Sequence, residues 1–386
     1  MGRCILHVGM QKTGSSSIQE TMFFGLRDRA YCYFSAGEIN GSRMLTTLTA
    51  GDSLAELYWG RSTAKPGFTD RWKAYYLGKL QLAMARAKPQ GSTLILSGED
   101  VWGAREEGIQ RLRKILEEYG FETTVIVYVR PWKSFLESNY QQRLKGMTKR
   151  LGTTLRKGCD LLRDGSKIDY RGKLEMFDRI FGRERVIAKK FDPGMFPGGC
   201  VVQDFFSTLG ISIEPSKIRR SNESMSMDAT RLLYAYWMFG PRERDWGEIK
   251  IWRHHWMILA LQELTGKGLR FHSRLLLPML ATHLQNTSWI EDRLGTSIRE
   301  DLTRDDDGDC VCEFSDFYRF KESTLQWLSK RVGGKMPSGL EGEEVARHVA
   351  LLMDRLRHQM PSVWKAVGSI DRFSERTWRR WGSWDR

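Results

Sequence analysis

Near the N-terminus, the polar stretch QKTGSSS at residues 11–17 follows a short apolar run and combines residue types that bind phosphate. The lysine supplies a mobile cation, and Gly14 lets the backbone pass close to an anion. If a helix begins at the serines, its first amides and its dipole favour a negatively charged group. The stretch therefore predicts an anion site at a strand–helix junction.

The order of residues separates this stretch from the ATP- and GTP-binding loop. That loop reads GxxxxGK[ST], with the lysine directly after the second glycine. Here Gly9 is followed by Lys12, Thr13 and Gly14, so the lysine comes before the second glycine. An ordinary strand–helix connection and a nucleotide kinase with an atypical phosphate loop both stay open at this point.

A second stretch, VIVYVRPWKSFLESNYQQ at residues 125–142, also joins an apolar run to anion-binding residues. Arg130 ends the apolar run, and a guanidinium at a strand end can bind phosphate through two parallel hydrogen bonds. Ser138 follows two turns into the next predicted helix, on the same side. Taken alone, Arg130 is an ordinary surface charge, but together with the first stretch it favours phosphate binding.

The elements that position these residues follow from apolar periodicity and from glycine and proline punctuation. Short apolar runs predict strands at residues 3–8, 92–100, 123–130 and 185–191. Helical spacing predicts helices at residues 15–26, 71–87, 106–119, 132–144, 170–181 and 201–209. Residues 41–73 read as irregular around one short helix.

Strands that alternate with helices predict an α/β fold with a parallel sheet flanked by helices. From residue 225 onward the pattern is helical without clear strands. We expect an α/β core at residues 1–225, which holds the nucleotide site. Residues 226–386 are expected to form a helical extension packed on the core, with acceptor binding as a role that the sequence leaves open.

The order Lys-Thr-Gly-Ser-Ser-Ser after an apolar strand resembles the 5′-phosphosulfate loop of sulfotransferases, which use 3′-phosphoadenosine-5′-phosphosulfate (PAPS). The second hallmark of that family, a strand ending in Arg with Ser eight residues later on a helix, resembles Arg130 and Ser138. The region after residue 170 is similar to bacterial carbohydrate-type members, with Asn222 and Ser224 at an Asn-x-Ser turn. The resemblance covers roughly residues 3–225 and implies a P-loop-like sheet.

The resemblance implies in-line transfer of a sulfuryl group from PAPS to a hydroxyl acceptor, more in keeping with a carbohydrate or glycolipid than a phenol. It implies Lys12 as the cation at the leaving oxygen and requires no metal. The implied nucleotide-binding residues are Gln11, Lys12, Thr13, Gly14, Ser15, Ser16, Ser17, Arg130, Ser138 and Arg220.

The chain also departs from the family pattern. Many members have Asp or Asn before the proline of the second motif, whereas here Pro131 follows Arg130 directly. The Lys-Gly motif that closes the nucleotide site in cytosolic sulfotransferases is not evident. Arg219 and Arg220 lie nearby in the sequence and are the residues we expect to replace it.

A sulfuryl transferase also needs a base for the acceptor proton, and Glu99 is the first choice. Glu99 and Asp100 end the predicted strand LILSGED, and ligands of parallel sheets bind at the carboxyl ends of strands. The resemblance supports a glutamate in this role, with Asp100 as the fallback. A helix cap or a salt bridge is the alternative role of Glu99. His7 is expected in the core, and His254 and His255 in the core or on the surface.

Composition limits the partners without choosing one. The 386 residues include 61 Lys and Arg against 47 Asp and Glu, so the net charge is +14 and anionic partners are favoured. A non-catalytic protein that binds polyanions is therefore an alternative to an enzyme. For the enzyme we expect a hydroxyl-bearing acceptor as partner and no nucleic acid.

The sequence also bears on the compartment. No apolar run reaches the ~20 residues of a membrane span, so a cytoplasmic location is expected. The six cysteines form no CxxC pair, which favours a reducing compartment with free thiols. Cys310 and Cys312 form a CxC spacing that we interpret as chance. The acidic residues 301–310 fail the calcium-loop pattern, so no metal is expected there.

Overall fold

The computed structural model describes residues 1–49, 68–146, 158–221, 224–241, 248–302, 309–337 and 339–361. The chain divides into two compact units. Unit 1 comprises Met1–Phe135, Ile168–Glu223 and Ala281–Glu300, and unit 2 comprises Leu136–Lys167, Ser224–Leu280 and Asp301–Arg386. The sequence placed one division at residue 225, whereas the chain passes between the units several times. Asn222 and the basic, tryptophan-rich residues 372–386 lie outside the described residues.

Unit 1 is built on a five-stranded parallel sheet, which confirms the α/β class. Its strands are β1 (Gly2–His7), β2 (Tyr31–Tyr33), β3 (Thr93–Ser97), β4 (Phe121–Val129) and β5 (Val186–Lys190), in the spatial order β2-β3-β1-β4-β5. β1 is central, because Leu6 pairs with Leu96 on one side and Val125 on the other. Strands covered on both faces read as continuous apolar runs, which is why the sequence revealed β1, β3 and β4, whereas β2 was not predicted.

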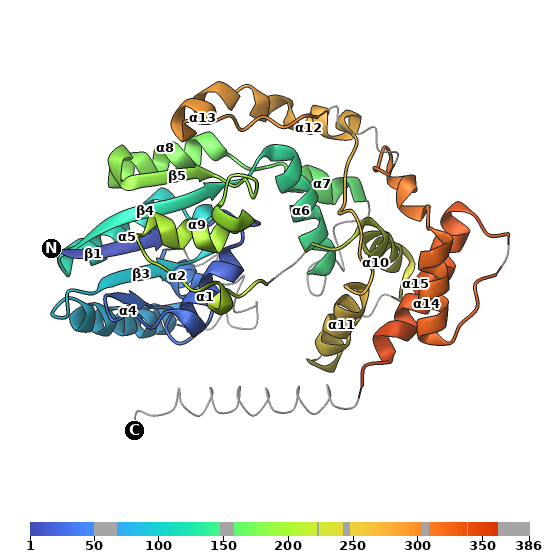
Figure 1. The fold of residues 1–386 in the computed structure, drawn as a ribbon, viewed down its shortest axis with the longest axis horizontal. Helices are drawn as coiled ribbons and strands as arrows, with labels where there is room; N and C mark the ends of the chain where they lie inside the picture. The colour runs from blue at the N-terminus through green and yellow to red at the C-terminus, as the bar shows by residue number, and fades with distance from the viewer. Residues whose placement is uncertain are drawn as a thin grey trace. The chain divides into compact units, whose positions relative to one another are not determined.

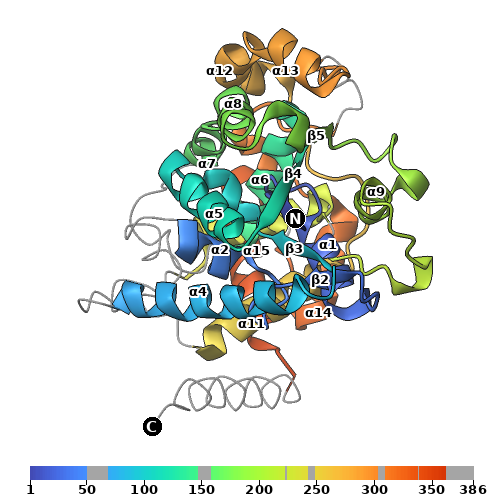
Figure 2. The same cartoon turned by 90° about the vertical axis from the view of Figure 1, so that its left-hand side faces the viewer.

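Helices cover both faces of this sheet (Figure 1). α1 (Ser15–Gly25) and α9 (Val201–Thr208) lie on one side, and α5 (Glu106–Glu118) and α8 (Tyr170–Phe181) lie on the other (Figure 2). The connection from β1 to β2 runs across the sheet in one direction, and the connections from β3 to β4 and from β4 to β5 run in the other. Because such crossovers are right-handed, the helices of the first connection and of the other two lie on opposite faces of the sheet.

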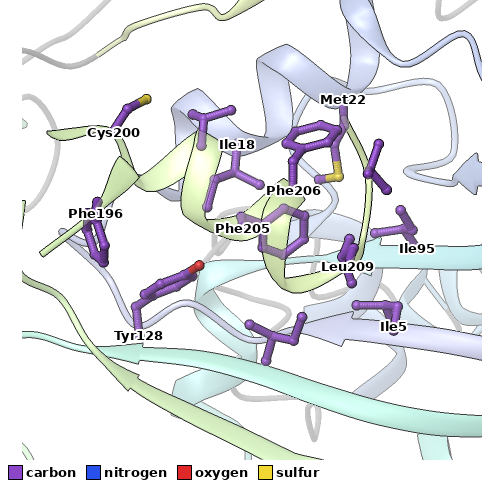
Figure 3. Close-up of a cluster of buried hydrophobic side chains, with 13 residues drawn as sticks. Ile5, Ile18, Met22, Ile95, Tyr128, Phe196, Cys200, Phe205, Phe206 and Leu209 are labelled. Atoms are coloured by element: carbon purple, nitrogen blue, oxygen red, sulfur yellow. The ribbon is translucent and has the colours of Figure 1, made fainter. Parts of the chain in front are cut away.

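The face under α1 and α9 is closed by apolar side chains from three sources (Figure 3). Phe205 and Phe206 of α9 are 0% and 1% exposed, and they pack with Ile18 and Met22 of α1. Ile5 of β1 belongs to the same cluster. Burial of a large side chain of this kind contributes about 1.5–3 kcal/mol, so α9 is a principal anchor of α1.

The remaining helices fall into those that belong wholly to one unit and those that span both, and α4 (Phe68–Ala87) begins three residues before its predicted start at residue 71. In unit 1 the former are α2 (Ser42–Thr49), α4 and α13 (Thr287–Leu294), with 3₁₀ turns at Glu99–Gly103, Arg183–Arg185, Pro197–Gly199 and Pro215–Lys217. In unit 2 they are α7 (Gly158–Gly165), α10 (Met227–Phe239), α11 (Glu248–Leu261), α14 (Glu322–Val332) and α15 (Gly342–His358), with a 3₁₀ turn at Phe314–Tyr318. α6 (Trp132–Lys145) and α12 (Ser273–Leu284) each have residues in both units.

Unit 2 is helical in its described part, as expected, with two isolated β-bridges in place of strands. Its core is aromatic: the ring of Tyr234 stacks on Phe317 at 4.2 Å between centroids, and Tyr140 stacks on the same ring at 5.8 Å. Gln141 of α6 fixes the start of α10 by donating to the Met225 carbonyl at 2.9 Å. These contacts hold α6 and α10 together within unit 2.

Candidate functional site

The sheet of unit 1 places the two expected phosphate-binding stretches side by side. The connection after β1 crosses toward β2, whereas the one after β4 leads to β5 on the opposite side. Adjacent strands whose connections part in this way form the switch point at which ligands bind in open α/β sheets. The loop of residues 8–14 leaves β1 there, and Arg130 directly follows β4.

The loop between β1 and α1 takes a conformation that depends on glycine at two places. Gly9 and Gly14 have φ of 91° and 78°, in the left-handed region that other residues rarely adopt. A Cβ on Gly14 would lie 2.5 Å from Val201 Cγ1, and one on Gly9 would lie 3.0 Å from Glu99 Cα. Lys12 also has a positive φ of 67°. The loop is thus held tightly between α9 and the end of β3.

Three hydroxyls of the loop and the first helical turn bond within the protein. Thr13 Oγ1 donates to the Met10 carbonyl at 2.6 Å, and Thr13 is fully buried. Ser15 Oγ reaches the same carbonyl at 3.4 Å. Ser17 Oγ accepts from the Ser221 amide at 3.0 Å. These side chains shape the loop, while Gln11 is exposed and Lys12, Gly14 and Ser16 are half-buried.

Arg130 joins the two stretches directly. Its Nη1 donates to the carbonyl oxygen of Lys12 at 2.6 Å. The guanidinium also lies over the ring of Phe191 at 5.1 Å, and the Arg130 carbonyl accepts from the Tyr170 hydroxyl at 2.8 Å. Phe191 directly follows β5, just as Arg130 directly follows the adjacent strand β4. The contact between the two residues could therefore have been predicted from their equivalent positions at the ends of adjacent strands.

The other expected nucleotide ligands lie in different places. Ser138 is half-buried on α6, in the part of that helix that belongs to unit 2. Arg220 is exposed in unit 1, next to Ser221, whose amide bonds Ser17 of α1. The Arg219 amide bonds Thr21 Oγ1 at 3.0 Å in the same way. The segment that carries Arg220 therefore runs along α1, the helix that the phosphate loop opens.

The end of β3 brings two carboxylates to the same edge of the sheet. The strand ends at Ser97, and Glu99 opens the 3₁₀ turn that follows, two residues beyond the strand in which the sequence placed it. Burial raises the pKa of Glu99, and the charge of Lys12 acts in the opposite direction. Burial also raises the pKa of Asp100, whose Oδ1 accepts from Gln11 Nε2 at 3.1 Å. Lys12 and Glu99 are thus electrostatic neighbours.

His7 lies beneath this edge, in the core as expected. It is fully buried, and burial lowers its pKa to about 3, so the ring is neutral. Its Nδ1 is 2.8 Å from Ser97 Oγ, which also accepts from Gln19 Nε2 at 3.1 Å. The histidine supports the end of β3. His254 is likewise buried in unit 2, at 2.7 Å from the Lys145 carbonyl.

One residue that the sequence did not single out lies beside Arg130. Glu300 accepts hydrogen bonds from the amides of Lys133 and Ser134, at 2.7 and 3.1 Å, at the start of α6. Burial raises the pKa of its carboxyl, against the effects of these amides and of the Arg130 charge. Nothing local marks Glu300, because its partners are more than 160 residues away in the chain.

Comparison with known proteins adds no family. No protein-family model matches the chain, and no curated protein matches its sequence significantly. In the described ranges no group of three or more His, Cys, Asp and Glu side chains could hold a metal ion. No helix among the same residues is long and apolar enough to cross a membrane.

Proposed function

We propose that this protein is a PAPS-dependent sulfotransferase with a P-loop-like nucleotide site in unit 1. The observation that carries the proposal is the hydrogen bond from Arg130 to the carbonyl of Lys12. The two stretches that resemble the sulfotransferase motifs are 118 residues apart in the chain, yet they meet at the carboxyl ends of adjacent strands. This is where the physics of a parallel sheet favours an anionic ligand.

In this proposal the loop of residues 8–14 receives the 5′-phosphosulfate. The amides of the first turn of α1 and the helix dipole provide a positive end. Gly14 stands at the N-cap, and having no side chain it leaves those amides open to a ligand. The carbonyl of Lys12 accepts a hydrogen bond from Arg130, which fixes the backbone of this residue. The lysine side chain supplies a positive charge near the bridging oxygen of PAPS.

Arg130 and Arg220 of unit 1 are the residues proposed for the 3′-phosphate, while the role expected for Ser138, which belongs to unit 2, stays a prediction. A guanidinium carries five N–H donors, so Arg130 can bind the loop and a phosphate together. The ring of Phe191 under the guanidinium limits its motion. A planar cation held in one orientation is suited to two-point recognition of phosphate.

The chemistry we propose is in-line transfer. Glu99 takes the proton of the acceptor hydroxyl while the acceptor oxygen forms its bond to sulfur. The bond between sulfur and the bridging oxygen breaks, and Lys12 and the loop amides stabilise the charge that develops on the departing 3′,5′-ADP. Burial raises the pKa of Glu99, so its carboxylate binds a proton more readily. This makes Glu99 a stronger base for the proton of the acceptor.

Calorimetry with 3′,5′-ADP, 5′-AMP and ATP tests the nucleotide. Tight binding of 3′,5′-ADP alone supports the proposal, and preference for ATP favours the atypical kinase instead. Transfer of ³⁵S from PAPS to a panel of carbohydrate hydroxyls then tests the reaction. Lys12→Ala should abolish most transfer, whereas Lys114→Ala, at an exposed position on α5, is the matched control.

Binding of polyanions without any transfer, unchanged in Lys12→Ala, would identify a non-catalytic protein. The acceptor class, carbohydrate or glycolipid, is part of the same proposal. It is tested by which members of the panel take up the label.

A further inference from the structure

Two cysteines in unit 2 lie closer together than their spacing in the sequence requires. Cys310 and Cys312 have their sulfur atoms 3.8 Å apart, and both side chains are half-buried. Val311 between them is fully buried. From the sequence alone we interpreted this spacing as chance, but the short distance between the sulfurs indicates a pair of thiols that can react with each other.

The backbone explains why the two thiols share one side. Val311 donates its amide to the Arg270 carbonyl and accepts from the His272 amide, both at 2.9 Å, and so forms a parallel bridge with Phe271. The bridge involves Val311 alone, and the chain bends at the cysteine on either side of it. With Val311 turned into the core, the two cysteines are left together on the opposite side.

The chain on both flanks of the pair is held. Asp309 Oδ1 lies 2.9 Å from Arg231 Nη2, and its other oxygen lies 3.4 Å from Lys321 Nζ. On the far side, the Cys312 amide donates to Asp316 Oδ2 at 2.7 Å. These contacts hold the sulfurs near each other without a covalent bond.

We propose that Cys310 and Cys312 form a reversible disulfide, so that this segment is a thiol–disulfide modification site of unit 2. Even in a fully extended chain alternate Cα atoms are only about 6.6 Å apart, inside the range of up to ~6.8 Å that disulfides span. The sulfurs need to approach by less than about 2 Å. The closed loop is too small to restrict the unfolded chain much, so the bond is suited to switching more than to stabilising the fold.

The oxidant in this proposal is a low-molecular-weight disulfide such as oxidised glutathione. The thiolate of one cysteine attacks it, which forms a mixed disulfide and releases one equivalent of the small thiol. The thiolate of the second cysteine then attacks the protein sulfur of the mixed disulfide and releases the other equivalent. Two protein thiols are oxidised by two electrons and one small disulfide is reduced to two thiols, which take up the two protons.

Mass spectrometry of the full chain at defined ratios of reduced to oxidised glutathione tests this site. After alkylation and digestion, the peptide with Cys310 and Cys312 should lose two hydrogens and resist alkylation as the buffer becomes oxidising. Dithiothreitol should restore both thiols. The same transition in urea should need a more oxidising buffer, because the unfolded chain no longer holds the sulfurs together.

Two variants complete the experiment. Cys32→Ser removes a half-buried cysteine of unit 1 and should leave the transition unchanged. Cys312→Ser should allow at most a mixed glutathione disulfide on Cys310. Full alkylation of both cysteines at every ratio, a separate glutathione on each sulfur, or pairing with a different cysteine would each overturn the proposal.

Discussion

The carboxyl groups of Glu99 and Glu300 lie at two places in unit 1 and are alike in burial but differ in their hydrogen-bond partners. Both are half-buried, and burial raises the pKa of both. Glu300 accepts hydrogen bonds from two amides at the start of α6. Among the described residues the side chain of Glu99 has no hydrogen-bond partner, and the charge of Lys12 lowers its pKa against the effect of burial.

The difference is the one we expect between a carboxylate that caps a helix and one that is proposed as a base. The oxygens of Glu300 are occupied by backbone amides, whose own bonds would be missing without it. Glu99 lies at a strand end next to a lysine, where a ligand can use its oxygens. Five measurements test this comparison and the site around it.

The largest expected effect is on turnover in Glu99→Gln. The substitution keeps shape and hydrogen-bonding capacity but removes basicity, so the transfer rate should fall by about 10²-fold or more. The affinity for 3′,5′-ADP should stay nearly unchanged. Transfer of ³⁵S from PAPS and calorimetry measure the two quantities.

Asp100→Asn is the control for Glu99→Gln, since Asp100 lies beside it and bonds Gln11. Normal turnover in both variants would place the base elsewhere. A fall in turnover in Asp100→Asn alone would exchange the roles of the two carboxylates.

The second effect is on nucleotide affinity in Arg130→Ala. A hydrogen bond to a charged group contributes about 1.5–3 kcal/mol, so the Kd for 3′,5′-ADP should rise at least about tenfold. The Kd for 5′-AMP should rise much less, because it lacks the 3′-phosphate. Equal weakening of both nucleotides would mean that Arg130 acts only by holding the loop through the Lys12 carbonyl.

The third effect is on stability in Glu300→Ala. Loss of a cap at a helix N-terminus lowers the free energy of unfolding by about 0.5–2 kcal/mol. Glu300→Gln retains an amide oxygen as acceptor and should lose less. Urea unfolding of both variants measures this, and equal stability of Glu300→Ala and the parent protein would contradict the role of a cap.

The smallest effect is a shift in titration. Because burial raises the folded-state pKa of Glu99, NMR of its side-chain carboxyl should show protonation at higher pH than for a glutamate in water. Lys12→Ala should raise this pKa further, since the lysine charge opposes the shift. A pKa at or below the ordinary value would show that Glu99 is solvated.

The same shift has a consequence for stability. A raised folded-state pKa means that the contribution of Glu99 is complete below the unfolded-state pKa and is lost as pH rises through the folded-state pKa. Glu99→Gln should therefore gain stability relative to the parent protein across that window. A glutamine variant that is less stable at neutral pH would instead indicate a structural role.

The sequence predicted the buried parts of unit 1 well. β1 and β4 contain continuous apolar runs, and α8 ends at Gly182 as expected. β2 was missed, because its three half-buried residues are too few to show a pattern. The strand predicted at residues 92–100 was too long, because β3 ends at Ser97. Nothing in the glycine and acidic residues after Ser97 indicated the 3₁₀ turn that begins at Glu99.

For the candidate site, the sequence indicated residue types but not their partners. Lys12, Arg130 and Glu99 could be identified from motifs and strand ends. The bond from Arg130 to the Lys12 carbonyl and the cap by Glu300 join residues far apart in the chain, and no local pattern encodes them. The inward turn of Thr13 depends on the loop conformation, which residue types alone do not determine.

The packing of α9 on α1 has a consequence for how the protein is synthesised. α1 is among the first elements to leave the ribosome, but Val201, which packs against Gly14, comes almost 190 residues later in the chain. Ser17 and Thr21 bond partners 204 and 198 residues later. During translation the apolar face of α1 therefore stays uncovered until α9 has been synthesised. A chain that ends before residue 200 leaves Ile18 and Met22 exposed, which favours aggregation.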